Sequence, residues 1–108
     1  MAITLPQIIQ KYVDSSDRHD VQSILSCFSD DAVVHDEAET LHGKKAIEDW
    51  ITKTIAKYKF HFNPLSIKQD AAGIVVEVEV SGTFDGSPIT LNYHFAIEGN
   101  KIVSLAID

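Results

Sequence analysis

One acidic side chain at the end of a short predicted strand is the residue of this sequence best placed to do chemistry. Ala32, Val34 and Asp36 alternate with Val33 and His35, and side chains two apart on a strand point to the same face of a sheet. If the two small apolar side chains face inward, the Asp36 carboxylate enters an apolar interior. Burying a carboxylate costs free energy unless the group is paired, hydrogen-bonded or protonated. The sequence therefore indicates Asp36 as a candidate proton carrier.

Three helices are predicted around this strand from the i, i+3, i+4 spacing of apolar side chains. Thr4 and Asp20 are the expected N-caps of the first two helices, because their side-chain oxygens can accept hydrogen bonds from free backbone N–H groups. Gly43 leads into the third helix, after a polar loop predicted over residues 37–42. The apolar faces consist of Leu5, Ile8, Ile9, Tyr12 and Val13; of Val21, Ile24, Leu25 and Phe28; and of Ala46, Ile47, Trp50, Ile51, Ile55 and Tyr58.

Beyond Tyr58 the hydrophobic period changes from helical to alternating, which is typical of strands. Turns are predicted at residues 70–73, 85–88 and 98–101, where Gly, Asp, Asn and Pro gather. Helices followed by strands in hairpins are typical of the α+β class. We expect three N-terminal helices packed on a strongly curved, mixed or antiparallel β-sheet that forms a cone. A small ligand would bind in the mouth or interior of such a cone.

Composition limits the classes of function open to this chain. Its 108 residues suit one domain, expected over residues 1–108. The formal net charge of −7 argues against a nucleic-acid partner, which needs a basic face on the protein. No apolar run approaches the length of a membrane span, and the single cysteine, Cys27, cannot form an internal disulfide. These features predict a cytoplasmic protein with no membrane partner.

Four side chains after the predicted strand have a superficial likeness to a metal site. His35, Glu37, Glu39 and His42 lie close together in sequence, but their spacing matches no compact ligand motif. No metal is therefore predicted. His35 also faces away from Asp36 by strand alternation, so we expect no His–Asp dyad between these neighbours.

A resemblance to a known superfamily rests on five segments, Gln10–Val13, Phe28–Asp36, Gly43–Trp50, Tyr93–Phe95 and Gly99–Ser104. With the order of the elements, they resemble the nuclear transport factor 2-like superfamily, and within it the ketosteroid isomerases and the SnoaL-like polyketide cyclases. The resemblance implies a cystatin-like, ketosteroid-isomerase-like fold for nearly the whole chain. The superfamily also holds dehydratases, ligand binders and pure interaction domains, so the fold alone does not define an activity.

The resemblance implies roles for three residues. In ketosteroid isomerases a tyrosine on the first helix donates a hydrogen bond to the substrate carbonyl oxygen, and Tyr12 occupies that place. An aspartate at the end of the first strand shuttles the proton, and Asp36 occupies that place. The second donor of the isomerases is a protonated aspartic acid before a His-Phe pair, whereas Tyr93 stands here before His94 and Phe95. A phenol donates a hydrogen bond at neutral pH without tuning, since its unperturbed pKa is about 10.

The implied reaction moves a proton next to a carbonyl group. Asp36 would remove the proton and return it elsewhere, while Tyr12 and Tyr93 stabilise the enolate oxygen. No cofactor is needed, so none is predicted, and the partner would be a small apolar molecule containing a carbonyl group. The loop after Asp36 is shorter than in the isomerases and the chain ends soon after its last strand, which disfavours a steroid-sized substrate. The expected pocket lining is Val34, Trp50, Val78, Phe84, Leu91 and Phe95.

Each of these residues also has an ordinary structural interpretation. Asp36 suits a solvated strand end, and Tyr12 and Tyr93 suit core packing. Two other functions therefore remain open: a non-catalytic pocket for a small apolar molecule, and a dimerising or scaffolding domain whose cone is filled by its own side chains. In this superfamily the outer sheet face commonly buries in a homodimer, which is expected here too. The predicted outer face carries Val75, Thr83, Thr90, Asn92, His94 and Ala96.

Overall fold

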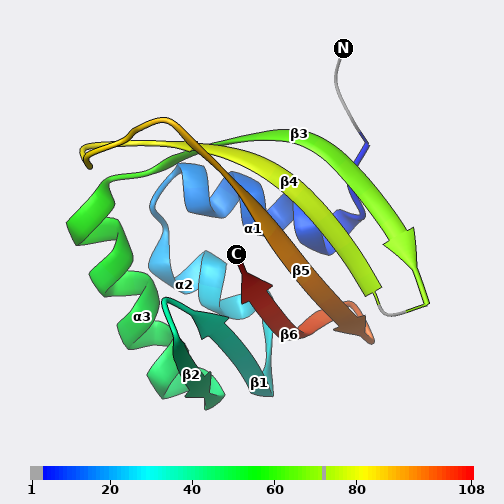
Figure 1. Ribbon diagram of the computed structural model, residues 1–108. Helices are drawn as coiled ribbons and strands as arrows, with labels where there is room; N and C mark the ends of the chain where they lie inside the picture. Colours follow the sequence, from blue (N-terminus) through cyan, green and yellow to red (C-terminus); the bar gives the residue numbers. More distant parts are fainter. Residues whose placement is uncertain (1–3, 72) are drawn as a thin grey trace.

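The computed structural model describes residues 4–71 and 73–108 (Figure 1). Three helices and six strands follow one another in an α+β order. Their bounds are α1 Gln7–Asp17, α2 Val21–Ser26, β1 Phe28–Asp36, β2 Glu39–His42, α3 Gly43–Tyr58, β3 His61–Asp70, β4 Gly73–Ser81, β5 Ile89–Glu98 and β6 Lys101–Ile107.

The first two helices meet at a polar junction. α1 begins at Gln7 with Pro6 at the N-cap rather than Thr4, and it continues through the polar run to Asp17. The run stays helical because Ser15 and Ser16 turn inward and are buried. The predicted cap of α2 is confirmed, since the Asp20 carboxylate accepts a hydrogen bond from the backbone N–H of Ser23 at 3.2 Å.

The prediction of a loop over residues 37–42 was wrong, because the last four residues of this segment form strand β2. β2 pairs antiparallel with β1, with Asp36 opposite Glu39. The two turn residues, Glu37 and Ala38, have φ values of 50° and 64°. Two-residue hairpin turns require such left-handed conformations and usually use Asn or Gly. The turn lacks both, so the sequence carried no hairpin signal there.

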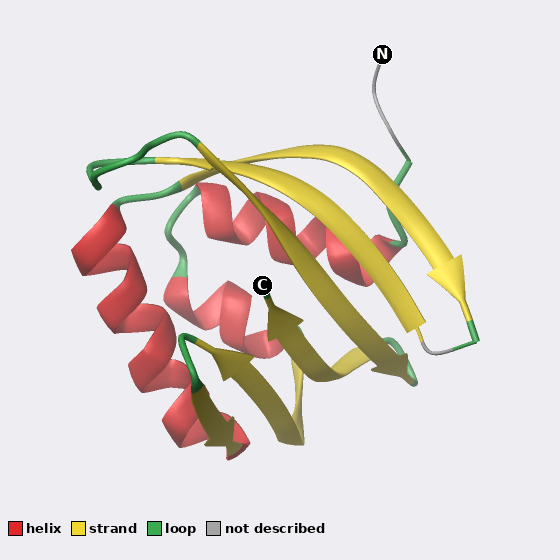
Figure 2. Cartoon of the chain, in the orientation of Figure 1, coloured by secondary structure: helices red, strands yellow, loops and turns green. Residues whose placement is uncertain are grey.

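The six strands form one curved, mixed sheet in the order β2-β1-β6-β5-β4-β3. Neighbouring strands are antiparallel except β1 and β6, which run parallel. The helices lie on the concave side of the sheet, with α1 beneath the arch of β3, β4 and β5 and α3 beside β1 and β2 (Figure 2). The predicted fold class is thereby confirmed.

The core lies between the helices and the concave face of the sheet. Its fully buried members include Ile9 of α1, Phe28 of β1, Ile47 of α3, Val76 of β4 and Leu105 of β6. One apolar core therefore ties every layer together, as a domain of this size requires. Within the described residues no helix is both long and apolar enough to span a membrane.

A close backbone approach joins the end of α3 to the segment after β4. The Thr83 N–H donates to the Tyr58 carbonyl oxygen at 2.8 Å. A Cβ atom added at Gly82 would overlap that same carbonyl oxygen and lie 3.1 Å from a ring carbon of Phe84. The missing side chain of Gly82 therefore allows the last turn of α3 to pack against the sheet.

We predict that Gly82→Ala lowers the free energy of unfolding by about 1–3 kcal/mol, the usual cost of overpacking. Urea denaturation of the purified variant measures this. Gly99→Asn is the matched control: no atom lies near the Cβ position and Asn tolerates its φ of +54°. Wild-type stability in Gly82→Ala would show that the approach of α3 is not tight.

Candidate functional site

The register of three neighbouring strands places Asp36 and Tyr93 on one face of the sheet. His35 of β1 pairs with Ala106 of β6, and Ala106 pairs with His94 of β5. Since side chains alternate between faces, the following row, which includes Asp36 and Tyr93, lies on the opposite face. Two residues far apart in sequence thus share one row of the sheet, with β6 between their strands.

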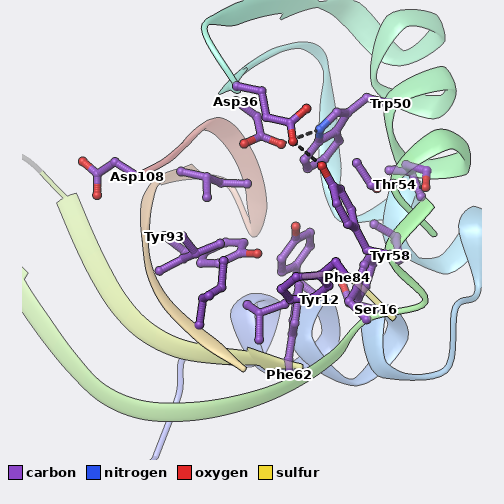
Figure 3. A pocket seen from close by; sticks show the side chains of 18 residues that line it. Tyr12, Ser16, Asp36, Trp50, Thr54, Tyr58, Phe62, Phe84, Tyr93 and Asp108 are labelled. Carbon is purple, nitrogen blue, oxygen red and sulfur yellow. Dashed lines mark hydrogen bonds between the residues drawn. The ribbon is translucent and has the colours of Figure 1, made fainter. Parts of the chain in front are cut away.

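A cavity of about 240 Å³ opens beside this row. It lies between the concave face of the sheet and helices α1 and α3 (Figure 3). Its polar lining comes from Tyr12, Ser16, Asp36, Glu37, Trp50, Thr54, Tyr58, Tyr93 and Asp108, and the rest is apolar. The three residues predicted to be catalytic therefore face one shared space.

The Asp36 carboxylate is half-buried at the edge of the cavity. The indole N–H of Trp50 on α3 donates a hydrogen bond to Asp36 Oδ2 at 2.9 Å. Burial raises the pKa of Asp36 above its usual value, and the carboxylates of Glu37 and Glu39 raise it further, whereas the Trp50 hydrogen bond lowers it. Asp36 is therefore a carboxylate with an increased affinity for a proton.

Tyr12 enters the cavity from the side of the helix α1. Its ring packs edge-on against Phe28 and Phe95, with ring centroids 5.9 and 5.6 Å away. The side chain is only 3% exposed. Burial raises the pKa of Tyr12 well above the usual range, and the negative charge of Asp36 raises it further. The phenol is thus a neutral hydrogen-bond donor at physiological pH.

Tyr93 of β5 provides a second phenol beside the first. The two ring centroids lie 6.5 Å apart, and the Tyr93 hydroxyl points into the cavity toward Tyr12 (Figure 3). Burial raises the pKa of Tyr93, as do its neighbours Tyr12 and Asp36. Among the described residues, none forms a hydrogen bond with the Tyr93 hydroxyl. A phenol that faces the cavity in this way can donate a hydrogen bond to a ligand oxygen.

A second polar pair at the cavity was not predicted from the sequence. The Tyr58 hydroxyl donates a hydrogen bond to Glu37 Oε1, which joins the end of α3 to the β1–β2 turn. Tyr58 also packs edge-on against Phe84, with ring centroids 5.5 Å apart. Tyr58 follows Trp50 and Thr54 at helical i, i+4 spacing, so these three residues of α3 lie along one wall of the cavity, together with Ile51. The spacing along α3 could have identified Tyr58 as a cavity residue. No feature of the sequence indicated that Glu37 would lie in a turn beside it.

The predicted lining residues fall into two groups. Trp50, Phe84 and Leu91 line the cavity. Val34, Val78 and Phe95 lie instead in the hydrophobic core, each at most 3% exposed. They share the concave face with cavity residues, but helix side chains cover them. Alternation along a strand identifies the face of a residue and does not say which part of that face a helix covers.

Comparisons with known proteins identify the family and the fold of the chain. The profile of the SnoaL-like domain family matches residues 9–105. A Sinorhizobium meliloti protein provisionally named a polyketide cyclase is 35% identical, with a TM-score of 0.92 and coverage of 96% of this chain and 95% of that one. No curated protein matches the sequence.

Two more distant structures share the fold. A Catenulispora acidiphila protein with a ketosteroid isomerase-like fold, solved with trimethylamine, is 18% identical with a TM-score of 0.82, covering 97% of this chain and 86% of that one. Rv0760c of Mycobacterium tuberculosis, solved with estradiol-17beta-hemisuccinate, is 16% identical with a TM-score of 0.75, covering 93% and 88%. The predicted superfamily is confirmed.

We predict that Asp36→Asn stabilises the protein at neutral pH and much less in acid. The folded protein binds the Asp36 proton more tightly than the unfolded chain does, because burial raises this pKa. The contribution of Asp36 to the free energy of unfolding is therefore greatest below the unfolded carboxyl pKa of about 3.9. This contribution is lost as the pH rises through the pKa of Asp36 in the folded protein. Asn is neutral throughout, so the variant avoids that fall. Urea denaturation at pH values on both sides of this window tests it.

The exposed residue Asp31, changed to Asn, is the control for loss of one negative charge. Asp31→Asn should not show the increase in the free energy of unfolding that is expected for Asp36→Asn at neutral pH. A stability change in Asp36→Asn of equal size at both pH values would contradict the desolvation argument.

We predict that Trp50→Phe raises the pKa of Asp36 further, because the variant keeps an aromatic wall and loses the hydrogen bond that lowers this pKa. A carboxyl titration followed by NMR measures the shift. Phe84→Leu changes another cavity wall without touching this hydrogen bond and should leave the titration near that of the wild type. An unchanged or lower midpoint in Trp50→Phe would show that the indole does not favour the charged carboxylate.

Proposed function

This chain belongs to the SnoaL-like domain family, and from that premise we propose that it is a cofactor-independent enzyme of the isomerase or cyclase type. It would move a proton next to a carbonyl group of a small apolar substrate. One observation carries the proposal: the half-buried Asp36 carboxylate and the buried phenols of Tyr12 and Tyr93 face the same cavity. A base beside two neutral donors suits enolate formation.

The reaction begins with Asp36 as the general base. Its carboxylate removes a proton from the carbon next to the carbonyl group, and a raised pKa brings such a base closer to neutral pH, where general bases work best. Trp50 is a positioning residue in this mechanism. Its indole N–H holds Oδ2 of Asp36, which orients the other carboxylate oxygen and limits the rotation of the group.

The negative charge then moves to the carbonyl oxygen, where Tyr12 and Tyr93 donate hydrogen bonds to it. Donors fixed in a dry site stabilise developing charge without reorganising, and each contributes on the order of 10²–10³ in rate. Protonated Asp36 returns the proton to a different carbon in an isomerase. In a cyclase the enolate carbon instead forms a C–C bond to a second carbonyl carbon of the same molecule, and the alkoxide oxygen formed there takes the proton from Asp36. The name of the Sinorhizobium protein supports that version.

The cavity volume limits the size of the substrate. The cavity of about 240 Å³ lies below the range of roughly 300–1,000 Å³ of drug-sized pockets. Small size thus agrees with the expectation that a steroid is not the substrate.

A ligand-binding protein without catalysis is the second candidate. The structures solved with trimethylamine and with estradiol-17beta-hemisuccinate support small-molecule binding as a use of this fold. A scaffolding domain filled by its own side chains is less well supported, because a cavity lies beside Asp36. The homodimer through the outer sheet face and the cytoplasmic location stay predictions.

We predict that the protein converts the β,γ-unsaturated isomer of cyclohexenone into the conjugated isomer, which ultraviolet absorbance detects. Asp36→Asn should lower kcat by about 10²–10⁴-fold, since it removes the base. Tyr12→Phe and Tyr93→Phe should each lower it by about 10²–10³-fold. His35→Asn is the control, because His35 is adjacent in sequence but exposed on the opposite face.

Unchanged turnover in Asp36→Asn would refute this role of Asp36. Binding of the ketone without any product in the wild type would favour the second candidate.

A further inference from the structure

The cavity shares one of its walls with a second hollow. A surface groove of about 330 Å³ lies between α3 and the β1–β2 hairpin. Four residues line both the cavity and the groove: Glu37, Trp50, Thr54 and Tyr58. A side chain that faces two hollows lies between them. These four residues therefore form a partition that separates the cavity from the groove.

Two hydrogen bonds hold the partition closed, and they differ in burial. The bond from the Trp50 indole to Asp36 Oδ2 is part-buried. The bond from the Tyr58 hydroxyl to Glu37 Oε1 is exposed to solvent. Water replaces the partners of an exposed hydrogen bond when it breaks, whereas a buried bond leaves its polar groups unpaired in a low dielectric. The bond between Tyr58 and Glu37 is therefore the one that opens more easily.

Glu37 stands on a turn with an unfavourable backbone conformation. Glu37 and Ala38 have φ values of 50° and 64°, in the left-handed region that residues with a Cβ atom rarely adopt. Such conformations persist only where other contacts enforce them. The strand pairing of Asp36 with Glu39 and the hydrogen bond from Tyr58 are two such contacts. Loss of the Tyr58 bond therefore frees the Glu37 side of the partition.

Tyr58 has a fixed backbone and a side chain with more freedom. Its carbonyl oxygen accepts the N–H of Thr83 at 2.8 Å, which ties the end of α3 to the sheet. Its ring is half-buried, with the ring of Phe84 at 5.5 Å and the Lys57 ammonium at 5.0 Å from its centre. Once the bond to Glu37 breaks, the phenol can turn about its own torsions while the helix stays in place.

A ligand that enters from the other side of the cavity meets this partition. Ile89 and Asp108 line the cavity and are exposed, and Asp108 lies across the cavity from Tyr58 (Figure 3). A molecule that enters past these two residues therefore reaches the partition at the inner end of the cavity. The length that it can bury then depends on whether the partition is closed.

We propose that the Glu37–Tyr58 hydrogen bond is a gate that determines how long a ligand the cavity accepts. When closed, as in this structure, the gate ends the cavity at the partition. When open, it joins the cavity to the groove, so that the end of a longer ligand passes between the two side chains toward Leu41 and Ala46. The pair is specificity-determining and contacts no reacting atom. The inference rests on the proposed function for the position of the ligand and does not require turnover.

Methyl ketones with straight chains of increasing length, from butanone to methyl nonyl ketone, test the gate in the intact protein. Trp50 is the only tryptophan and lines both hollows, so its fluorescence reports binding. Each further methylene that enters an apolar cavity should raise the affinity by about fourfold. In the wild type this rise should stop at the chain length that reaches the partition, and longer ketones should show a plateau.

Variants that open the gate should move the plateau to longer ketones. Tyr58→Phe removes the donor and Glu37→Ala removes the acceptor. Each should raise the affinity for ketones beyond the wild-type plateau by about fourfold or more, as expected when at least one more methylene is buried. The double variant should show no further increase, because both changes remove the same contact.

Two further variants separate the hydrogen bond from charge and side-chain size. Glu37→Gln keeps an amide oxygen that can accept the Tyr58 hydrogen bond, so it should retain the wild-type plateau. Glu39→Ala is the matched control, because Glu39 is a carboxylate of the same hairpin that lines the groove and not the cavity. Its plateau should also be that of the wild type.

A wild-type series without a plateau would overturn this inference, and so would an unchanged plateau in both Tyr58→Phe and Glu37→Ala. Additive effects in the double variant would contradict a shared contact. Shifted plateaus without any turnover of the β,γ-unsaturated ketone would leave the gate standing and contradict catalysis. Turnover with unchanged plateaus would do the reverse, and failure of every ketone to bind would overturn both.

Discussion

The whole site depends on the unfavourable burial of the Asp36 carboxylate. Burial raises its pKa, and the Trp50 indole counters this only in part. A carboxylate fully paired with a cation would be more stable and would make a weaker base. A strained or desolvated group persists only when the surrounding structure enforces it. Most of the fold can be understood as that enforcement.

Helix α3 illustrates how the packing enforces this placement. Ile47 and Ile51 are 0% and 2% exposed, and they anchor one side of the helix in the core. Burying one such side chain stabilises a protein by about 1.5–3 kcal/mol. On the adjoining side, Trp50 and Tyr58 face the cavity. A rotation of the helix that broke the Trp50 hydrogen bond would also expose Ile47 and Ile51. The free energy lost by exposing these two side chains opposes such a rotation.

Strand alternation and helical spacing were enough to predict the α+β fold and to identify Asp36 as a candidate site residue. They did not predict which strands far apart in sequence pair in the sheet. No local feature of the sequence predicts the parallel pairing of β1 with β6. That pairing nevertheless places Asp36 and Tyr93 in the same row of the sheet. The β1–β2 turn uses Glu37 and Ala38 in conformations that usually call for Asn or Gly, so the sequence concealed both this hairpin and the partner of Tyr58.

The replacement of a carboxylic acid by Tyr93 changes what the site must achieve. An aspartic acid donates a hydrogen bond only when its surroundings keep it protonated, whereas a buried phenol is protonated already. Here the charge of Asp36 helps to keep both phenols neutral. A site built in this way gains hydrogen-bond donors without neutralising the Asp36 carboxylate, which is the base in the proposed function.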